Sequence, residues 1–297
     1  MTFEIAYDPV EQTLVIPGVL RVDPPVGVQA PLVVDSPHSG TDYPQDFRVV
    51  CDRDGLRQAE DTHVEALVAS APSHGATFLQ ALFPRSYIDV NRGEGDIDPA
   101  LLADQWDTPL SPGPKTKLGM GLVRRFSRAG EPMYRRPLAS ASVRHRISAY
   151  YRPYHRMLDR LLDQSHERFG IAYYLDCHSM PSVGTGMSVD EGRARADFVL
   201  GDRDGTTCEP GIVEVVESEL RRLGFTVLRN DPFKGVELVR RHGRPVERRH
   251  ALQIEVNRGL YMNERTLVRG LGFTQIVAAF DQVLAAVAAY AHTQAKT

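Results

Sequence analysis

The sequence contains few cysteines and no strong excess of charge of either sign. Its three cysteines, Cys51, Cys177 and Cys208, are widely separated and form no CxxC pair. Such scattered cysteines argue against a disulfide framework and indicate reduced thiols in a cytoplasmic protein. The formal net charge is only −3, so neither nucleic acid nor an anionic membrane is expected as a partner.

Long hydrophobic runs are also missing. The most apolar stretch, "IVAAFDQVLAAVAAYA", is interrupted by Asp281 and Gln282, so no membrane span is predicted. The opening residues, "MTFEIAYDPVEQTLVIPG", have neither the basic segment nor the apolar core of a signal peptide. Hydrophobic residues still make up 42% of the chain, which suits a substantial core. We therefore expect a single domain over residues 1–297, and the oligomeric state stays open.

Short apolar runs alternate with segments of helical spacing. Strands are expected at residues 2–7, 13–16, 30–34, 75–83, 86–91, 171–176, 196–202, 225–230 and 250–257. Helices are expected at 54–72, at 141–170 with a kink near Pro153, at 209–224 and from about 265 onward. This order predicts an α/β fold with a mixed, largely parallel sheet covered on both faces.

Two further segments stand apart from this alternation. Residues 1–30 are expected to form a hairpin-like N-terminal extension. Residues 93–140 are irregular and rich in Gly and Pro, which is typical of a functional insertion and makes them a candidate lid. Ligands of such sheets bind beyond the carboxyl ends of the strands, so reactive residues at strand ends are the candidate site.

The stretch "YLDCHSMP" places Asp176, Cys177 and His178 in a row at one strand end. Side chains alternate across a strand, so Asp176 and His178 share one face while Cys177 points to the other. A nucleophilic thiolate needs its base within hydrogen-bond reach. The pattern therefore disfavours a Cys177–His178 pair and predicts a packed, inert Cys177.

His38 and His178 both follow apolar runs. Two imidazoles and one carboxylate form a three-ligand zinc site that leaves a position for water. The carboxylate could be Asp61 or Glu60, with His63 as a weaker alternative ligand. The spacing is dispersed, unlike HExxH, so two hydrogen-bonded structural histidines are the competing interpretation. Asp176 would fix the tautomer of the His178 ring.

Glu255 lies in "LQIEVN", where apolar and polar residues alternate. A carboxylate inside such a strand is costly to bury, which points to a general base or to an ion pair with an arginine such as Arg258. Arg85, Asn91 and Arg92 lie on or beside the strand expected at 86–91. Arginine suits carboxylate binding or stabilisation of a developing oxyanion, although a surface ion pair is its more common role.

Seven motifs occur in one order over about residues 31–265: "SPHSGTDYP", "EDTHVEAL", "RSYIDVNRG", "YLDCHSMP", "GDRDG", "NDPFKG" and "LQIEVNRGLYMNE". Together they resemble the N-formylglutamate amidohydrolase (deformylase) family, which is similar in fold to zinc carboxypeptidases and aspartoacylases. The resemblance implies a three-layer α/β/α sandwich. It also implies hydrolysis of N-formyl-L-glutamate to formate and L-glutamate, the last step of one route of histidine degradation.

The resemblance extends to individual residues of the expected metal site. His38 of "PHSG", Asp61 of "EDTHVEAL" and His178 of "DCHS" resemble zinc ligands, with another divalent metal as the alternative. Thr41 stands where carboxypeptidases and aspartoacylases have the Glu of a compact HxxE, so the third ligand departs from their pattern. Glu255 resembles the carboxylate base of those enzymes.

The same resemblance suggests how a substrate would be held. Arg85 resembles the arginine that polarises the scissile carbonyl. Asn91 and Arg92 of "DVNR" resemble the pair that binds a substrate carboxylate, and Arg258 is a further candidate for this role. Two other functions stay open: hydrolysis of a different N-acyl amino acid at the same site, and binding of a metal or amino acid without turnover.

Overall fold

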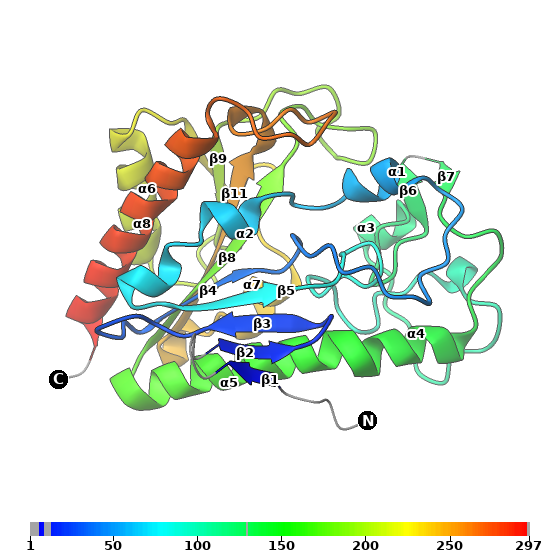
Figure 1. The fold of residues 1–297 in the computed structure, drawn as a ribbon, viewed down its shortest axis with the longest axis horizontal. Coiled ribbons are helices and arrows are strands. Elements are labelled where there is room, and N and C mark those ends of the chain that lie inside the picture. The colour runs from blue at the N-terminus through cyan, green and yellow to red at the C-terminus, as the bar shows by residue number, and fades with distance from the viewer. Residues whose placement is uncertain (1–5, 9–12, 129, 296–297) are drawn as a thin grey trace.

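The structure, a computed structural model, describes residues 6–8, 13–128 and 130–295. A nine-stranded mixed sheet forms its centre, in the order β1-β2-β3-β5-β4-β8-β11-β9-β10 (Figure 1). The strands are β1 (Ala6–Asp8), β2 (Thr13–Ile16), β3 (Leu20–Asp23), β4 (Leu32–Ser36), β5 (Thr77–Ala81), β8 (Ala172–Met180), β9 (Phe198–Gly201), β10 (Val227–Arg229) and β11 (Arg249–Asn257). The four central strands, β5, β4, β8 and β11, are mutually parallel, and β1 to β3 join them antiparallel.

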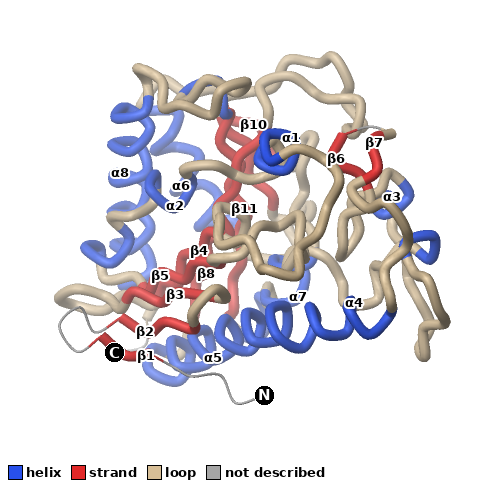
Figure 2. Tube along the Cα trace, turned by 45° about the vertical axis from the view of Figure 1, so that its right-hand side comes forward, coloured by secondary structure: helices blue, strands red, loops and turns tan. Residues whose placement is uncertain are grey.

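Helices cover both faces of this sheet. The main helices are α2 (Val64–Leu67), α6 (Pro210–Arg222) and α8 (Phe273–Gln294) on one face, with α4 (Ser140–Arg146), α5 (Arg152–Phe169) and α7 (Glu237–His242) on the other. Figures 1 and 2 show α6 and α8 on one side of the strands and α5 running along the other. The predicted three-layer α/β/α arrangement is confirmed.

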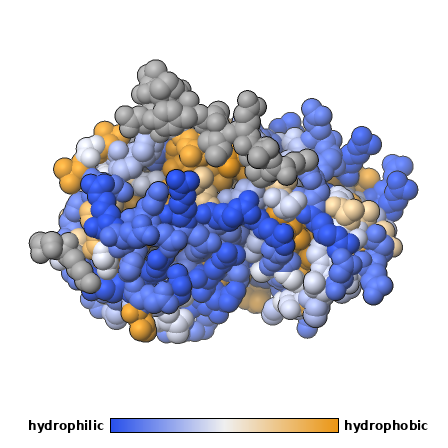
Figure 3. All heavy atoms as spheres, turned by 90° about the horizontal axis from the view of Figure 1, so that it is seen from below, coloured by the Kyte–Doolittle hydropathy of each residue, from blue (hydrophilic) through white to orange (hydrophobic). Residues whose placement is uncertain are grey.

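Strand alternation decides which side chains enter which core. Leu175, Cys177 and Ile254 pack under α6 and α8, whereas Ala172, Tyr174 and Ala251 pack under α5. The surface seen from below in Figure 1, toward α5, is mainly hydrophilic with scattered apolar residues (Figure 3). The polar outer side of α5 is consistent with a helix that buries a single stripe of apolar residues against the sheet.

Three predicted elements were wrong. Residues 54–72 form two short helices, α1 (Arg53–Arg57) and α2, followed by a 3-10 turn at Ala71–His74. Residues 86–91 form a loop instead of a strand, so Arg85, Asn91 and Arg92 are loop residues. The last helix begins at Phe273, after a turn region, instead of near residue 265. The first strand lies at Ala6–Asp8, and residues 2–5 of the predicted strand fall outside the described residues.

Near Pro153, where the sequence predicts a kink, the helix changes its hydrogen-bond pattern. A π-helical segment, Ile147–Tyr151, joins α4 to α5, and Pro153 lies in the first turn of α5. Pro is tolerated there because its missing N–H would have no helical acceptor. Gly170 ends α5 at a positive φ of 68°, as expected for a helix stop.

Helix α8 is long and apolar enough to cross a membrane by composition alone, and it is the only such helix in the described part of the chain. Ile276, Phe280, Val283 and Leu284 of this helix lie in the core, where α8 packs against α6 and α2. A core helix of a globular domain has the same composition.

The segment 93–140 contains little regular structure: a 3-10 turn at Pro99–Leu101, α3 (Pro114–Lys117), and a two-stranded ribbon of β6 (Phe126–Arg128) and β7 (Glu131–Pro132). Figure 2 shows these elements together beyond the end of the central strands. Ile97, Leu101, Leu122 and Val123 are buried in the core beneath α5. The segment is therefore anchored to the domain by its own apolar residues.

Candidate active site

Two adjacent parallel strands deliver the two histidines. His38 follows β4 by two residues, and His178 lies within β8, which continues to Met180 and is thus longer than predicted. Gly40 packs so closely on the next loop that a Cβ there would lie 2.3 Å from the backbone carbon of Leu82. Only glycine allows this approach, which fixes the chain carrying His38 against the sheet.

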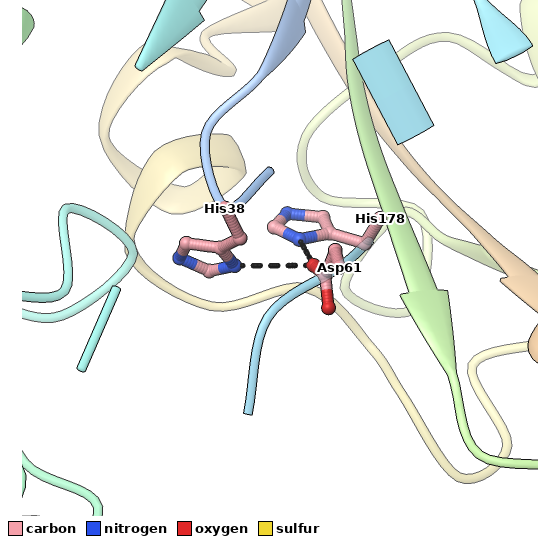
Figure 4. A group of neighbouring side chains, drawn as sticks. All are labelled: His38, Asp61 and His178. Atoms are coloured by element: carbon pink, nitrogen blue, oxygen red, sulfur yellow. Dashed lines mark hydrogen bonds and ion pairs between the residues drawn. The ribbon is translucent and has the colours of Figure 1, made fainter. Parts of the chain in front are cut away.

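His38, Asp61 and His178 form a buried cluster of metal-ligating groups (Figure 4). Oδ2 of Asp61 lies 2.9 Å from Nδ1 of His178 and 3.3 Å from Nδ1 of His38. One potential ligand atom of each residue lies within 4.8 Å of the others. Two imidazoles and a carboxylate are the donor set of many catalytic zinc sites, so the residues present fit a zinc ion.

The far nitrogen of each imidazole faces a second carboxylate. Nε2 of His38 lies 2.7 Å from Oδ1 of Asp89, and Nε2 of His178 lies 2.6 Å from Oδ1 of Asp176. The contact with Asp176 is short, but neither oxygen of Asp176 has a hydrogen bond of regular geometry within the described residues. Carboxylates in this position hold metal-binding imidazoles in one tautomer, with Nδ1 free to bind.

Sequence reasoning identified Asp176 but missed Asp89. The signal was present, since Asp89 interrupts the apolar run of "SYIDVN" two residues before Asn91. Burial would raise the pKa of Asp89, but Arg85 and His38 hold it well below the usual range. Asp89 is therefore ionised, and its carboxylate supports the ring of His38.

The other two candidates for the third ligand have different partners. Glu60 is fully buried but accepts a hydrogen bond from Tyr43 and pairs with Arg57 at 3.3 Å. His63 adopts a left-handed φ of 72°, and its Nε2 lies 2.9 Å from the carbonyl oxygen of Leu267. The structure thus groups Asp61, and neither Glu60 nor His63, with the two histidines.

Two arginines neutralise the second oxygen of Asp61. Nη2 of Arg258 lies 2.9 Å from Oδ1 of Asp61, and Nη1 of Arg85 lies 3.5 Å from the same atom. Arg85 also pairs with Asp89 through Nη2 at 2.9 Å. Burial acts to raise the pKa of Asp61, but His178, His38 and Arg85 hold it well below the usual range. Asp61 is thereby kept as a carboxylate.

Glu255 lies beside this cluster on β11, in register with His178 of β8. It faces away from the apolar core that holds Ile254 and Val256, as strand alternation predicts. Oε1 accepts a hydrogen bond of 3.0 Å from Gln253. Burial raises the pKa of Glu255 to about 7, although His178 opposes this shift. A carboxylate with such a pKa can take up and return a proton near neutral pH.

The residues expected to bind substrate surround the cluster, but each has protein partners. Oδ1 of Asn91 accepts from the Leu238 amide at 2.9 Å, and its Nδ2 lies 3.3 Å from Nε2 of His178. Nε of Arg92 donates to the carbonyl of Met120 at 2.9 Å. Arg258 donates to Oγ of Ser179 at 2.9 Å in addition to Asp61. Asn91, Arg92 and Arg258 therefore hold the site together in this structure.

Comparison with known proteins decides the family. The model of the N-formylglutamate amidohydrolase family matches residues 30–262. This chain belongs to that family. Two curated relatives are N-formylglutamate deformylases of Pseudomonas putida and Pseudomonas aeruginosa, with 32% and 30% identity. The first match covers 79% of this chain and 82% of the relative, and the second covers 80% and 84%.

Solved structures agree with this family membership. The crystal structure of N-formylglutamate amidohydrolase from Ralstonia eutropha JMP134 is 48% identical and has a TM-score of 0.88, over 93% of this chain and 99% of its own. A gene product of Agrobacterium tumefaciens shares the fold at a TM-score of 0.64, with 17% identity over 96% of this chain and 98% of its own. The family fold therefore spans nearly the whole chain.

Cys177 offers a direct check on the nucleophile of this family member. Its side chain lies in the core on the opposite face of β8 from His178, and burial raises the pKa of the thiol well above its usual range. Cys177→Ala is expected to keep kcat within about twofold, because inert packing cysteines behave as small apolar side chains. Steady-state rates of the folded variant would measure this, and a loss of turnover with retained metal would restore the cysteine mechanism.

Proposed function

We propose that the protein is a zinc-dependent deformylase that hydrolyses N-formyl-L-glutamate to formate and L-glutamate. In this role it would be a cytoplasmic enzyme acting on a small N-acyl amino acid, at the last step of one route of histidine degradation. The observation that carries the proposal is the buried His38–Asp61–His178 donor set beside Glu255 in a member of this family. Two imidazoles and one carboxylate are a donor set of catalytic zinc sites.

The mechanism follows from the positions of the side chains. When bound by His38, Asp61 and His178, zinc supplies Lewis-acid chemistry that makes water acidic near neutral pH and polarises the formyl carbonyl. Glu255 takes the proton from the attacking water as the new C–O bond forms. Glu255 then returns that proton to the amide nitrogen as the C–N bond breaks, which releases formate and the amine of glutamate.

Arg85 is the residue that would stabilise the negative charge on the formyl oxygen. Its guanidinium lies between Asp61 and Asp89, and its buried Nε has no acceptor within the described residues. A donor held in place in a water-poor site is effective against charge that develops during the reaction. Asp61 and Asp89 keep Arg85 charged, and together they raise its pKa against the effect of burial.

Purified protein tests this proposal through its metal content and its substrate preference. We expect about one zinc per chain, loss of hydrolysis on dialysis against a chelator, and recovery on addition of zinc. N-formyl-L-glutamate should be hydrolysed at least about tenfold faster than N-acetyl-L-glutamate or N-formyl-L-aspartate. Hydrolysis that survives complete metal removal would reject the zinc mechanism. Metal binding without any turnover would instead identify a binding protein.

A further inference from the structure

Two cations of the segment 93–140, Arg124 and Lys115, lie near the metal cluster, and their side chains have no partner among the described residues. Arg124 is only 7% exposed, and its buried Nε has no acceptor in the part of the chain that the structure describes. Within residues 6–8, 13–128 and 130–295, the side chains of Arg124 and Lys115 have neither a hydrogen bond nor an ion pair. An unpaired cation in a buried position is unusual, because burial removes the hydration that stabilises its charge.

The electrostatic surroundings of both cations are unfavourable. Burial, and to a smaller extent the charge of Arg85, lowers the pKa of Arg124 to about 9. Burial and then the charge of Arg92 lower the pKa of Lys115 to about 8. Asp61 and Asp89 also act on Arg124, which places its guanidinium within electrostatic range of the metal cluster. The two groups thus form a region of positive charge that an anion would neutralise.

The backbone explains how Arg124 reaches the site. Residues 120–124 form a turn closed by a bridge between Met120 and Arg124. The carbonyl of Leu122 accepts a 2.8 Å hydrogen bond from the amide of Asp89, the residue that supports His38. The carbonyl of Met120 accepts a 2.9 Å hydrogen bond from Arg92. Two hydrogen bonds therefore attach this turn, and Arg124 with it, to the loop 89–92 beside the metal cluster.

The neighbouring arginines cannot take the same role without breaking existing contacts. Arg92 donates to two backbone carbonyls, and Arg258 binds Asp61 and Ser179. Arg195 forms a two-bond ion pair with Asp190 at 2.8 Å. Arg85 bridges Asp61 and Asp89. Among these cations, Arg124 and Lys115 are the two whose side chains make neither a hydrogen bond nor an ion pair within the described residues.

We propose that Arg124, assisted by Lys115, binds one of the two carboxylates of the substrate and thereby determines specificity for acidic N-acyl amino acids. This inference rests on the proposed function, since N-formylglutamate is a dianion. Arginine suits such a site because its planar donors can bind both oxygens of a carboxylate. The charges of Asp61 and Asp89 are balanced by Arg85 and Arg258, so the charge of Arg124 is available for the ligand.

Three substrates and a matched pair of variants test the assignment. For Arg124→Met, kcat/KM on N-formyl-L-glutamate is expected to fall about 10²- to 10³-fold, because a charge-assisted bidentate contact is lost. One amide of N-formylglutamate, the α-amide or the γ-amide, lacks the carboxylate that Arg124 binds. On that amide, the kcat/KM of the variant should fall less than about threefold. Lys115→Met should show the same pattern more weakly, whereas the exposed Lys117→Met should equal the wild type.

The pattern over the three substrates decides the outcome. The proposal is supported if Arg124→Met loses activity on N-formylglutamate and on one amide but not on the other. The carboxylate that is missing from the unaffected amide is then the ligand of Arg124. An equal loss on all three substrates, or no loss on the dianion, overturns the proposal. Arg124→Lys should restore part of the activity, because it keeps the charge but loses the planar donors.

Stability and ligand binding supply readouts that do not depend on turnover. Removal of an unpaired buried charge should leave the Tm of ligand-free Arg124→Met unchanged or raise it by a few degrees. A Tm several degrees lower would indicate a structural role and count against the proposal. Calorimetry with glutarate, a dicarboxylate without an amide, should show at least about tenfold weaker binding to the variant than to the wild type.

Glutarate binding separates the proposed deformylase function from the proposed carboxylate site at Arg124. If the wild type does not hydrolyse N-formylglutamate but glutarate binding still depends on Arg124, the proposed function fails and the carboxylate site stands. If the wild type hydrolyses N-formylglutamate and neither kinetics nor binding depends on Arg124, only the carboxylate site fails. A wild type that binds no glutarate also counts against this site.

Discussion

Glu255→Gln is expected to lower kcat by at least about 10³-fold while the metal content stays at the wild-type level. Glutamine keeps the shape of the side chain but cannot accept the proton of the attacking water. Glu255 belongs to β11 and is not part of the His38–Asp61–His178 donor set, so metal binding should persist. Steady-state kinetics together with metal analysis of the same preparation would measure both quantities.

Glu247→Gln is the matched control for this substitution. Glu247 is exposed on a 3-10 turn just before β11, where it pairs with Arg244 at 3.1 Å. Exposed ion pairs contribute little, so this variant should match the wild type in activity and stability. If Glu255→Gln retained more than about a tenth of the wild-type kcat, Glu255 would have no place as the general base.

Asp61→Asn is expected to reduce both the metal content and the stability. Asp61 is the carboxylate of the donor set, and it also neutralises Arg258 and Arg85. Loss of its charge should weaken metal binding and lower activity by at least about 10³-fold. It also removes the carboxylate partner of the buried Arg258, while Arg85 keeps its ion pair with Asp89, and this costs about 3 kcal/mol in the free energy of unfolding.

Urea denaturation of metal-free protein separates the two effects of Asp61→Asn. A drop in unfolding free energy without metal measures the arginine contacts alone, and titration of zinc measures the site. Asp54→Asn is a suitable control, because Asp54 is exposed in the first turn of α1 and lies outside the cluster. A stable, zinc-loaded and active Asp61→Asn would exclude Asp61 as a ligand and return Glu60 and His63 to consideration.

Patterns of period two predicted the central part of the site well. The alternation in "YLDCHSMP" and "LQIEVN" correctly separated Cys177 and Ile254 from His178 and Glu255, because a strand leaves no freedom in which face a residue occupies. Short apolar runs located β4, β8, β9 and β11 for the same reason. Local pattern is sufficient where the backbone is regular.

Loop residues could not be placed in this way. The run "SYIDVN" looks like a strand, but its apolar residues Tyr87, Ile88 and Val90 are buried from a loop. The choice of Asp61 over Glu60 depends on which carboxylate the turn before α2 directs at β8. The turn 120–124 lies beside the loop 89–92 because of hydrogen bonds between segments about 30 residues apart in the sequence. Such contacts join residues far apart in the sequence, and no local spacing encodes them.

The attachment of residues 120–124 to the loop 89–92 has a consequence for protein engineering. Both hydrogen bonds are made by main-chain carbonyl oxygens of the turn, at Leu122 and Met120, so they do not depend on the side chains there. An exchanged turn of equal length could therefore present a different side chain at position 124 while Asp89 and the metal cluster keep their support. The preference for one class of acyl amino acid could then be changed by exchange of this turn, without a change in the residues that carry out the hydrolysis.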